Sequence, residues 1–257
     1  MITATAPRLA AGASLSRILA VAGLALAIFA VLVLAAGPIG WRAGLWHYRI
    51  GLLTLMPAAG CLGVAALALS VAALLAGLRA RSRRDLTGAL LGMLIGAGVA
   101  YFPWHWSNQR GAFPRVNDVT TDLADPPSLA FSEASRKAEE GNPTAYDAHQ
   151  FAGVQQRAYP DIVPARLAVP PAAAFDKALA LVKARAWVIV ETDRGAGVID
   201  ANDRSFWFGF TDDVAIRVTT DGEGSRVDIR SSARQGRGDY GVNARRVRAF
   251  LAALSGR

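Results

Sequence analysis

Long runs of hydrophobic residues without any charge dominate the first 110 positions of the chain. Three runs are long enough to matter, at about residues 18–37, 50–78 and 86–104. A helix needs about 20 apolar residues to cross the hydrocarbon of a bilayer, with about 17 as the lower bound. The first two runs meet this length, and the third meets it when it continues past Phe102. The pattern therefore predicts a membrane domain of three transmembrane helices over residues 1–106.

Shorter patterns follow Pro171. Apolar residues recur at helical spacing from Phe175 to Val182 and again from Val247 to Leu254. Between these two helices, five runs read as strands separated by short turn sequences, so neighbouring strands are expected to be antiparallel. The five runs are Trp187–Thr192, Gly197–Asn202, Ser205–Phe210, Val214–Thr220 and Ser225–Arg234. This order predicts a two-layer α+β domain over residues 172–257, with a meander sheet of about five strands flanked by two helices.

Residues 107–171 are rich in Pro, Asp, Asn and Ser and show little periodicity. We expect an irregular, Pro-rich segment with short turns. A long structureless segment inside a compact domain is unusual. We therefore expect Val116–Thr121 to add an edge strand and Ser132–Glu140 to form a helical turn.

The last predicted strand, Ser225–Arg234, alternates apolar residues with charged ones, so one of its faces is charged throughout. A glycine-rich turn follows, and Asn243 is placed to cap the last helix, with Val242 and Val247 as a hydrophobic staple. Polar residues gather around this bend and on the neighbouring strand. The candidate binding residues are Arg217, Arg230, Arg234, Asp239, Asn243 and Arg246.

Three interpretations of these residues stay open from the sequence. They could form a solvated outer sheet face with cross-strand ion pairs, each contributing about 0.2–1 kcal/mol. They could line a pocket for a carboxylate or a phosphate, because the guanidinium fork suits bidentate anion binding. Asp239 and Asn243 could also simply fix the turn and the last helix.

The string RSSARQGRGDYGVNARR at this bend resembles the signature of the domain-of-unknown-function family 1499. Ala233 stands where the family pattern has a serine, and the pieces Asn117–Pro127 and Tyr159–Pro164 also fit the family. The resemblance covers the chain from about Phe113 to its end. It implies a domain of bacteria and plastids, often tethered to a membrane, without an established activity. The signature residues are Arg230, Ser231, Arg234, Gly236, Asp239, Gly241, Asn243 and Arg246.

The charge is distributed unevenly along the chain. Residues 1–112 carry nine Lys and Arg and one acidic residue, whereas residues 113–257 carry 19 of each kind. The net charge of +8 therefore belongs to the membrane flanks, and no nucleic acid is expected as a partner.

Four arginines lie between the second and third spans, and short loops rich in Lys and Arg remain in the cytoplasm. This predicts a multi-pass protein of the cell inner membrane with a cytoplasmic N-terminus and an extracytoplasmic C-terminal domain. Six aromatic residues then share the outer interface. They are Trp41, Trp46, Tyr48, Tyr101, Trp104 and Trp106.

Inside the spans, Gly88, Gly92 and Gly96 form a ridge of small residues that lets another helix approach closely. The partner helix belongs either to the same chain or to a second copy. Pro57 is expected to kink the second span. Cys61 is the only cysteine, so no disulfide forms within the chain.

The sequence offers few signals for catalysis. The three histidines form no metal-ligand cluster and no Ser-His-Asp set, and no glycine loop has the spacing of a phosphate cradle, so neither metal nor cofactor is predicted. Phe206, Phe208 and Phe210 are expected in the core. Trp207 is expected to line a groove or to meet the membrane.

The residues therefore favour a membrane-tethered extracytoplasmic module that binds or assembles with an envelope protein, with the lipid bilayer as its other partner. The alternative is a carrier or sensor of a lipid-like or anionic small molecule, with an arginine at the head group. A hydrolase without a recognisable motif is a third, less favoured hypothesis.

Overall fold

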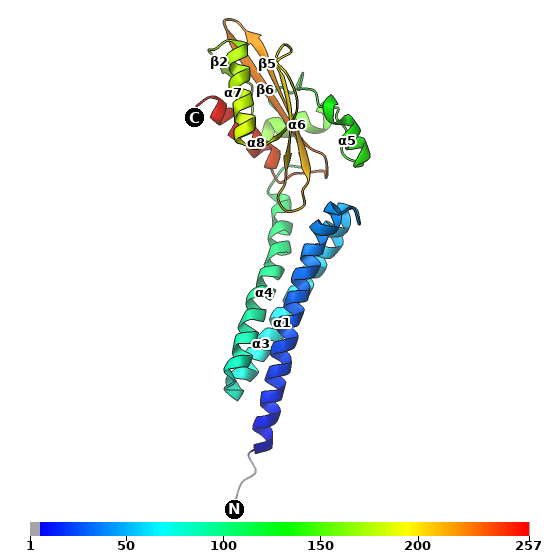
Figure 1. Ribbon diagram of the computed structural model, residues 1–257, viewed down its shortest axis with the longest axis vertical. Helices are drawn as coiled ribbons and strands as arrows, with labels where there is room; N and C mark the ends of the chain where they lie inside the picture. Colours follow the sequence, from blue (N-terminus) through cyan, green and yellow to red (C-terminus); the bar gives the residue numbers. More distant parts are fainter. Residues whose placement is uncertain (1–5, 257) are drawn as a thin grey trace, which may run out of the picture. The chain divides into compact units, whose positions relative to one another are not determined.

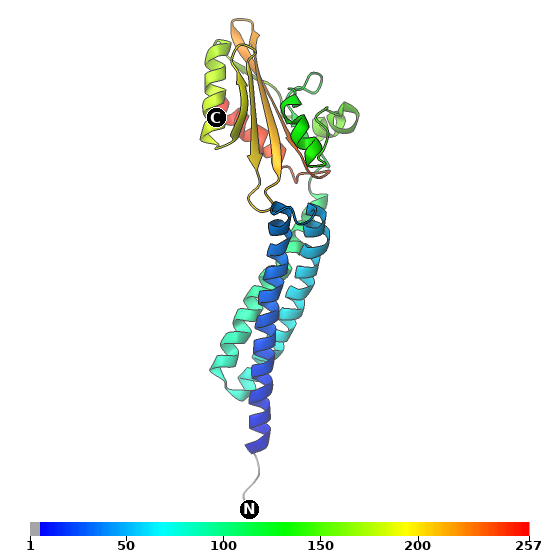
Figure 2. The same ribbon diagram turned by 45° about the vertical axis from the view of Figure 1, so that its right-hand side comes forward.

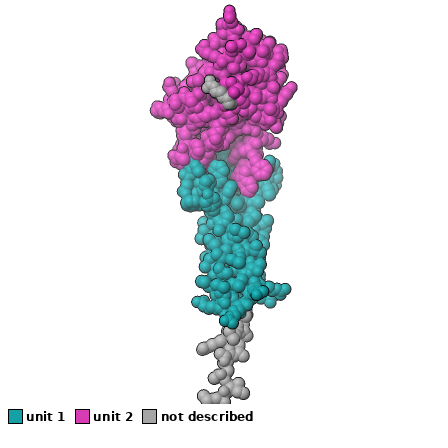
Figure 3. All heavy atoms as spheres, turned by 90° about the vertical axis from the view of Figure 1, so that its left-hand side faces the viewer, with its two compact units in different colours: residues 1–110 teal, residues 111–257 magenta. Residues whose placement is uncertain are grey.

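The computed structural model describes residues 6–256, and the chain divides into two compact units, residues 1–110 and 111–257 (Figure 3). Each unit is described by itself below. The N-terminus that the sequence predicts to be cytoplasmic lies outside the described residues.

The first unit consists of three long helices, as predicted (Figure 1). By length and composition, Leu15–Arg42, Tyr48–Ala80 and Arg83–Asn108 are each able to cross a membrane. These stretches exceed the predicted spans because the helices continue into their polar flanks. The helical elements are α1 (Ala6–Arg42), α2 (Tyr48–Ile50), the π-helical turn η1 (Gly51–Leu55), α3 (Met56–Ala80), α4 (Arg83–Asn108) and the 3₁₀ turn η2 (Gln109–Gly111).

Small residues allow these helices to pack closely. A Cβ atom added at Gly96 in α4 would lie 2.9 Å from the carbonyl oxygen of Gly63 in α3. A Cβ at Gly92 would lie 3.2 Å from the backbone nitrogen of Leu24 in α1, and one at Gly88 would contact Ala20 at 3.5 Å. The glycine ridge therefore packs against helices of the same chain, as in the first of the two predicted alternatives.

The irregular turn η1 lies directly before Pro57. Proline lacks an N–H, and its ring clashes with the carbonyl group four residues earlier in a regular helix. A π-helical turn, Gly51–Leu55, replaces the regular α-helical hydrogen bonding just ahead of this proline. The structure thus has a π-helical turn beside Pro57, where the sequence predicts a kink.

The second unit is an antiparallel sheet in the order β1-β6-β5-β4-β3, and β2 pairs with β6 beside β1 (Figure 2). Strands β3 to β6 correspond to four of the five strands of the predicted meander. The strands are β1 (Asp118–Thr120), β2 (Ala165–Leu167), β3 (Val188–Asp193), β4 (Val198–Arg204), β5 (Thr211–Asp221) and β6 (Gly224–Ala233). The helices are η3 (Ala130–Ser132), α5 (Glu133–Ala138), α6 (Ala148–Ala158), α7 (Pro171–Ala184) and α8 (Val242–Leu254).

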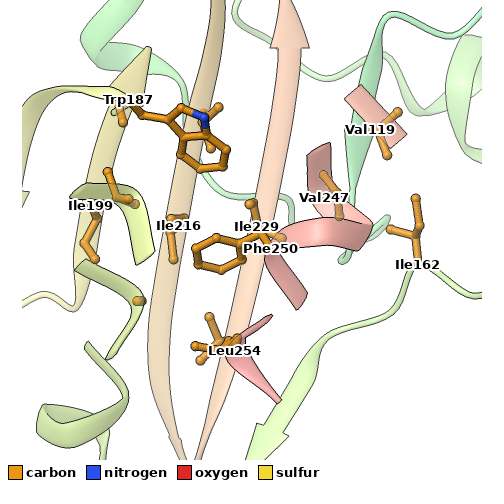
Figure 4. Close-up of a cluster of buried hydrophobic side chains, with 14 of the residues drawn as sticks. Val119, Ile162, Trp187, Ile199, Ile216, Ile229, Val247, Phe250 and Leu254 are labelled. Atoms are coloured by element: carbon orange, nitrogen blue, oxygen red, sulfur yellow. The ribbon is translucent and has the colours of Figure 1, made fainter. Parts of the chain in front are cut away.

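Helices α7 and α8 cover one face of the sheet and form the core with it (Figures 1 and 2). Phe250 of α8 stacks on Trp187 with ring centroids 6.0 Å apart, and it lies over Ile216 and Ile229 of β5 and β6 (Figure 4). The predicted fold class is therefore confirmed. Beyond the prediction, residues 121–147 cover the opposite face of the sheet.

Three local predictions are wrong. Ser205–Phe210 forms a turn instead of a strand, because the backbone N–H of Ser205 donates to the carbonyl oxygen of Phe210 at 2.9 Å. Phe206 is consequently 91% exposed instead of buried, whereas Phe208 is buried, at 5% exposed, without belonging to the core formed by α7, α8 and the sheet. The segment 107–171 is more regular than expected, since it contains α6 and β2 in addition to the edge strand and the helical turn.

The start of the last helix also differs from the prediction. Gly241, with a φ of 73°, is the N-cap of α8, and Asn243 lies inside the first turn. Val242 begins the helix and is 37% exposed, so it does not form a staple with the buried Val247.

Candidate functional site

The charged residues of β5 and β6 form a buried layer on the sheet face opposite α7 and α8. Residues 121–147, with α5, cover this face (Figure 2). The interpretation as a solvated outer face is therefore wrong, because none of the six central residues is more than 6% exposed. This polar layer consists of Asp118, Arg136, Asp213, Asp228, Arg230 and Arg234.

Arg230 is bonded to protein acceptors through all three guanidinium nitrogens. Its Nε and Nη2 atoms donate to the two carboxylate oxygens of Asp118 at 2.9 and 2.6 Å, a bidentate pair. Nη1 and Nη2 also donate to the carbonyl oxygens of Pro127, at 3.2 Å, and Thr144, at 2.8 Å. The ring of Tyr146 lies 5.4 Å from the guanidinium carbon. Arg230 thus joins β6 to β1 and to the covering segment.

Asp213 on β5 is fully buried between two arginines. Arg136 of α5 donates to it through Nε at 2.7 Å, and Arg234 donates through Nη2 at 2.8 Å. Arg234 also pairs with Glu139 at 2.7 Å, and Arg136 donates to the carbonyl oxygen of Ser232 at 3.1 Å. A buried carboxylate is stable as an anion only with such partners. The Asp213 cluster therefore attaches α5 to the sheet.

The rim of the layer is partly open to solvent. Arg226 donates to Asp228 at 2.8 Å and to Asp122 at 2.6 Å, and Arg217 donates to Asp125 at 2.9 Å. Burial alone would raise the pKa of Asp122, but backbone N–H groups and the two arginines lower it overall. Because the Arg217 and Arg226 side chains are 24% and 30% exposed, this rim has access to solvent.

A second cluster lies where the last turn meets α8. Asp239 accepts hydrogen bonds from the backbone N–H groups of Gly241, at 2.8 Å, and Asn243, at 2.6 Å. The Oδ1 atom of Asn243 accepts from the hydroxyl of Ser231 at 2.6 Å and from Arg246 at 2.5 Å. This geometry matches the interpretation in which Asp239 and Asn243 fix the turn and the helix.

Arg246 completes this helix cluster, which we define as Asp203, Asp212, Ser231, Asn243 and Arg246. Its guanidinium donates to Asp203 at 2.9 Å and to Asp212 at 2.7 Å. Burial raises the pKa of Asp212, and Arg246 partly offsets this effect. Asp212 and Asp213 are adjacent in β5, so their side chains point to opposite faces of the sheet.

The six predicted site residues therefore belong to two clusters on opposite sheet faces, instead of one. Arg217, Arg230 and Arg234 are on the face of the polar layer, whereas Asp239, Asn243 and Arg246 lie at the start of α8. The ridge Gly88, Gly92 and Gly96 lies in the first unit.

The strand alternation suggests Asp228, and Asp212 or Asp213, as acidic neighbours of these arginines, but it does not identify Asp118, Asp122 and Asp125. Several partners come from the piece Asn117–Pro127, which the family resemblance had marked without giving it a role. Thr121 donates to Asp228 at 3.0 Å, and the carbonyl oxygen of Asn117 accepts from Asn243 at 3.1 Å. The two separate motif pieces are thus each other's hydrogen-bonding partners.

One buried carboxylate lacks such compensation. Asp200 on β4 is 6% exposed, and its Oδ1 atom has no hydrogen-bond partner among the described residues. Burial, followed by the nearby charges of Glu191 and Asp213, raises the pKa of Asp200 to about 7. Groups with such a pKa are suited to proton transfer near neutral pH. The sequence does not predict this raised pKa, because Asp200 simply alternates with apolar residues of β4.

A groove of about 470 Å³ opens where β1 and β2 leave a gap along β6. Its lining includes the polar residues Arg166, Arg226, Asp122 and Gln155. Tyr159 also lines it, and the hydroxyl of Tyr159 is buried without a hydrogen-bond partner among the described residues. Within the described part of the chain, no group of three or more His, Cys, Asp and Glu side chains is arranged to hold a metal ion.

Comparison with known protein families identifies a match to the second unit. The family model described as protein of unknown function (DUF1499) matches residues 118–254, which include all of the polar layer and all of the helix cluster. No similarity to a curated protein or to a solved structure was found. Because the match covers more than half of the chain, the protein belongs to the DUF1499 family of proteins of unknown function.

Proposed function

We propose that this protein is a membrane-tethered module of the cell envelope that binds or assembles with another protein through its C-terminal unit. The main support for the proposal is that the arginines of the family signature point into their own domain. Arg230, Arg234 and Arg246 are bonded to carboxylates of their own domain. The signature thus builds a scaffold, and recognition is left to the exposed surfaces that this scaffold presents.

The free edge of β3 is the surface that best fits a polypeptide partner. β3 ends the sheet, and no described strand pairs with its outer edge. Val188 and Val190 are 60% and 48% exposed on this strand. An extended segment of a partner can add to such an edge through main-chain hydrogen bonds, with side-chain contacts supplying specificity.

Photo-crosslinking in cells tests this binding surface. A photoreactive amino acid at Val188 should give an adduct with a discrete envelope protein. The same amino acid at Glu223, in the exposed β5–β6 turn at one end of the sheet, is the matched control. If position 188 gives no adduct, or the same adducts as position 223, the edge of β3 is not the binding surface.

We place the protein in the inner membrane with the C-terminal unit outside the cytoplasm. The support is the connection between α3 and α4, where Arg79, Arg81, Arg83 and Arg84 lie in or beside a short turn. Short basic loops remain cytoplasmic. Aromatic residues mark the opposite ends of the helices, including a Tyr101–Trp104 pair with centroids 5.6 Å apart, as at a membrane interface.

Cysteine labelling tests this orientation. Cys61→Ala first removes the native cysteine. Ser82→Cys or Glu223→Cys then introduces one new cysteine in each of two variants. In intact spheroplasts, a membrane-impermeant maleimide should label position 223, and it should reach position 82 only after lysis. The reverse pattern would place the C-terminal unit in the cytoplasm.

A second candidate function is capture of a small anion or an anionic head group in the groove between β1 and β2. Arg166, Arg226 and the unpartnered Tyr159 hydroxyl favour it. Native mass spectrometry of the full chain released from nanodiscs should then show extra mass that is lost in Arg166→Ala. Arg194→Ala, which also removes an exposed aspartate-paired arginine, is the control and should keep the ligand. A clean protein mass in all three proteins would exclude this candidate.

A further inference from the structure

The turn between β4 and β5, residues 205–210, lies at the end of the sheet where the chain enters the second unit. The strand register shows this, because Asp118 at the start of β1 is aligned through Ser232 and Asp213 with Asn202 near the end of β4. We call this end of the sheet the linker end. Only residues 109–117 separate it from α4, and nine residues reach at most about 30 Å. The linker end is therefore tethered within reach of the bilayer surface.

The turn at the linker end presents aromatic side chains to solvent. Phe206 is 91% exposed and Trp207 is 40% exposed. Behind them, Phe208 and Phe210 stack with centroids 5.0 Å apart, and the backbone N–H of Phe210 donates to the hydroxyl of Ser205 at 2.9 Å. These contacts within the turn stabilise its conformation, and Phe206 extends from it into solvent.

Three arginines at the linker end have no acidic partner among the described residues. Arg115 precedes β1, Arg204 ends β4 and Arg237 follows β6, and all three are exposed. None of them forms an ion pair among the described residues. Arg166 and Arg248, which are also exposed, are by contrast paired with aspartates. The linker end therefore combines unneutralised positive charge with exposed aromatic rings.

We infer that the linker end of the C-terminal unit docks on an anionic lipid surface, with Phe206 and Trp207 entering the interface and Arg115, Arg204 and Arg237 contacting lipid phosphates. Aromatic rings prefer the depth of the head groups, and basic residues near an anionic leaflet are attracted to it. Charge complementarity and the short tether select lipid as the occupant over a protein. The inference holds for either orientation of the protein across the membrane.

Nitroxide labels report the depth of this turn in the full-length protein. In the Cys61→Ala background, Phe206→Cys carries the label at the turn, and Glu223→Cys carries it at the opposite end of the sheet. Both proteins are placed in nanodiscs of phosphatidylglycerol or of phosphatidylcholine. In phosphatidylglycerol, the label at 206 should be accessible to oxygen and protected from a water-soluble nickel complex, whereas the label at 223 should remain in water.

The arginines should control this insertion. Replacing Arg115, Arg204 and Arg237 with Gln should lower the ratio of inserted to free turns by about fivefold per arginine. Replacing phosphatidylglycerol with phosphatidylcholine should also lower this ratio. A label at 206 that is as open to the nickel complex as the label at 223 would overturn the inference. Protection from both reagents in either lipid would also overturn it, since that result indicates a protein contact.

Discussion

The signature arginines of this chain bind carboxylates of their own domain. The alternation along β6 correctly predicts that Arg230 and Arg234 share a face, but it does not predict whether water reaches that face. The answer depends on residues 121–147, which cover the layer with backbone carbonyls and with Arg136. Such a segment has no periodicity, because its role is to supply individual hydrogen-bond partners.

Asp200 should make the stability of the second unit depend on pH. In the folded protein, burial and the charges of Glu191 and Asp213 raise the pKa of Asp200 to about 7. In the unfolded chain these effects are absent, and the pKa is near 3.8. The folded state therefore binds the extra proton between these values, so the stability from this group is present at low pH and is lost as the pH rises toward 7. Asp200→Asn should raise the free energy of unfolding at pH 8 by on the order of 2 kcal/mol and by little at pH 4.5.

Pulse proteolysis of the full-length protein in urea and mild detergent measures this difference for the C-terminal unit. Glu191→Gln provides an independent check, because removing that charge should move the loss of stability to lower pH. An identical pH dependence in wild type and Asp200→Asn would show that Asp200 keeps an ordinary pKa.

Elements with one dominant pattern were predicted well from the sequence, and elements with mixed patterns were not. The long apolar spans, helix α7 and strands β3 to β6 follow simple patterns of apolar residues. The sequence does not predict α6, because its buried face includes Gln155, whose side chain bonds to the backbone N–H and carbonyl of Thr120 at 3.1 and 2.6 Å. The turn at Phe206 was misread because alternating aromatic residues resemble a strand.

The packing of α4 gives a prediction at the level of a single element. Gly96→Val should destabilise the helix bundle by about 1–3 kcal/mol through overpacking, because its Cβ would lie 2.9 Å from the backbone of α3. Gly98→Val in the same helix is the control, since a Cβ there meets nothing within 4 Å. Thermal aggregation of the detergent-solubilised protein should occur at a lower temperature for Gly96→Val alone. Equal behaviour of the two variants would mean that α3 and α4 do not pack through Gly63 and Gly96.

The whole molecule combines a membrane unit built on small residues with a second unit built on buried ion pairs. The first unit accounts for the net positive charge, and the second is electrically balanced. That balance has a structural reason, because the arginines and acids of the second unit are largely each other's partners across β1, β5, β6 and residues 121–147. The family signature therefore describes how this unit holds together, and its exposed surfaces carry the proposed interactions.

A double-mutant cycle on Arg230 and Asp118 tests the scaffold role of the signature most directly. Arg230→Ala and Asp118→Ala should each lower the free energy of unfolding by about 3–5 kcal/mol, because each leaves a buried charge without its partner. The double variant should lose far less than the sum, since no unpaired charge remains. The exposed pair Arg166 and Asp221 is the control cycle, with a coupling below about 1 kcal/mol. If Arg230→Ala instead keeps wild-type stability and shows no coupling to Asp118, the signature arginine is not part of a scaffold and the account is wrong.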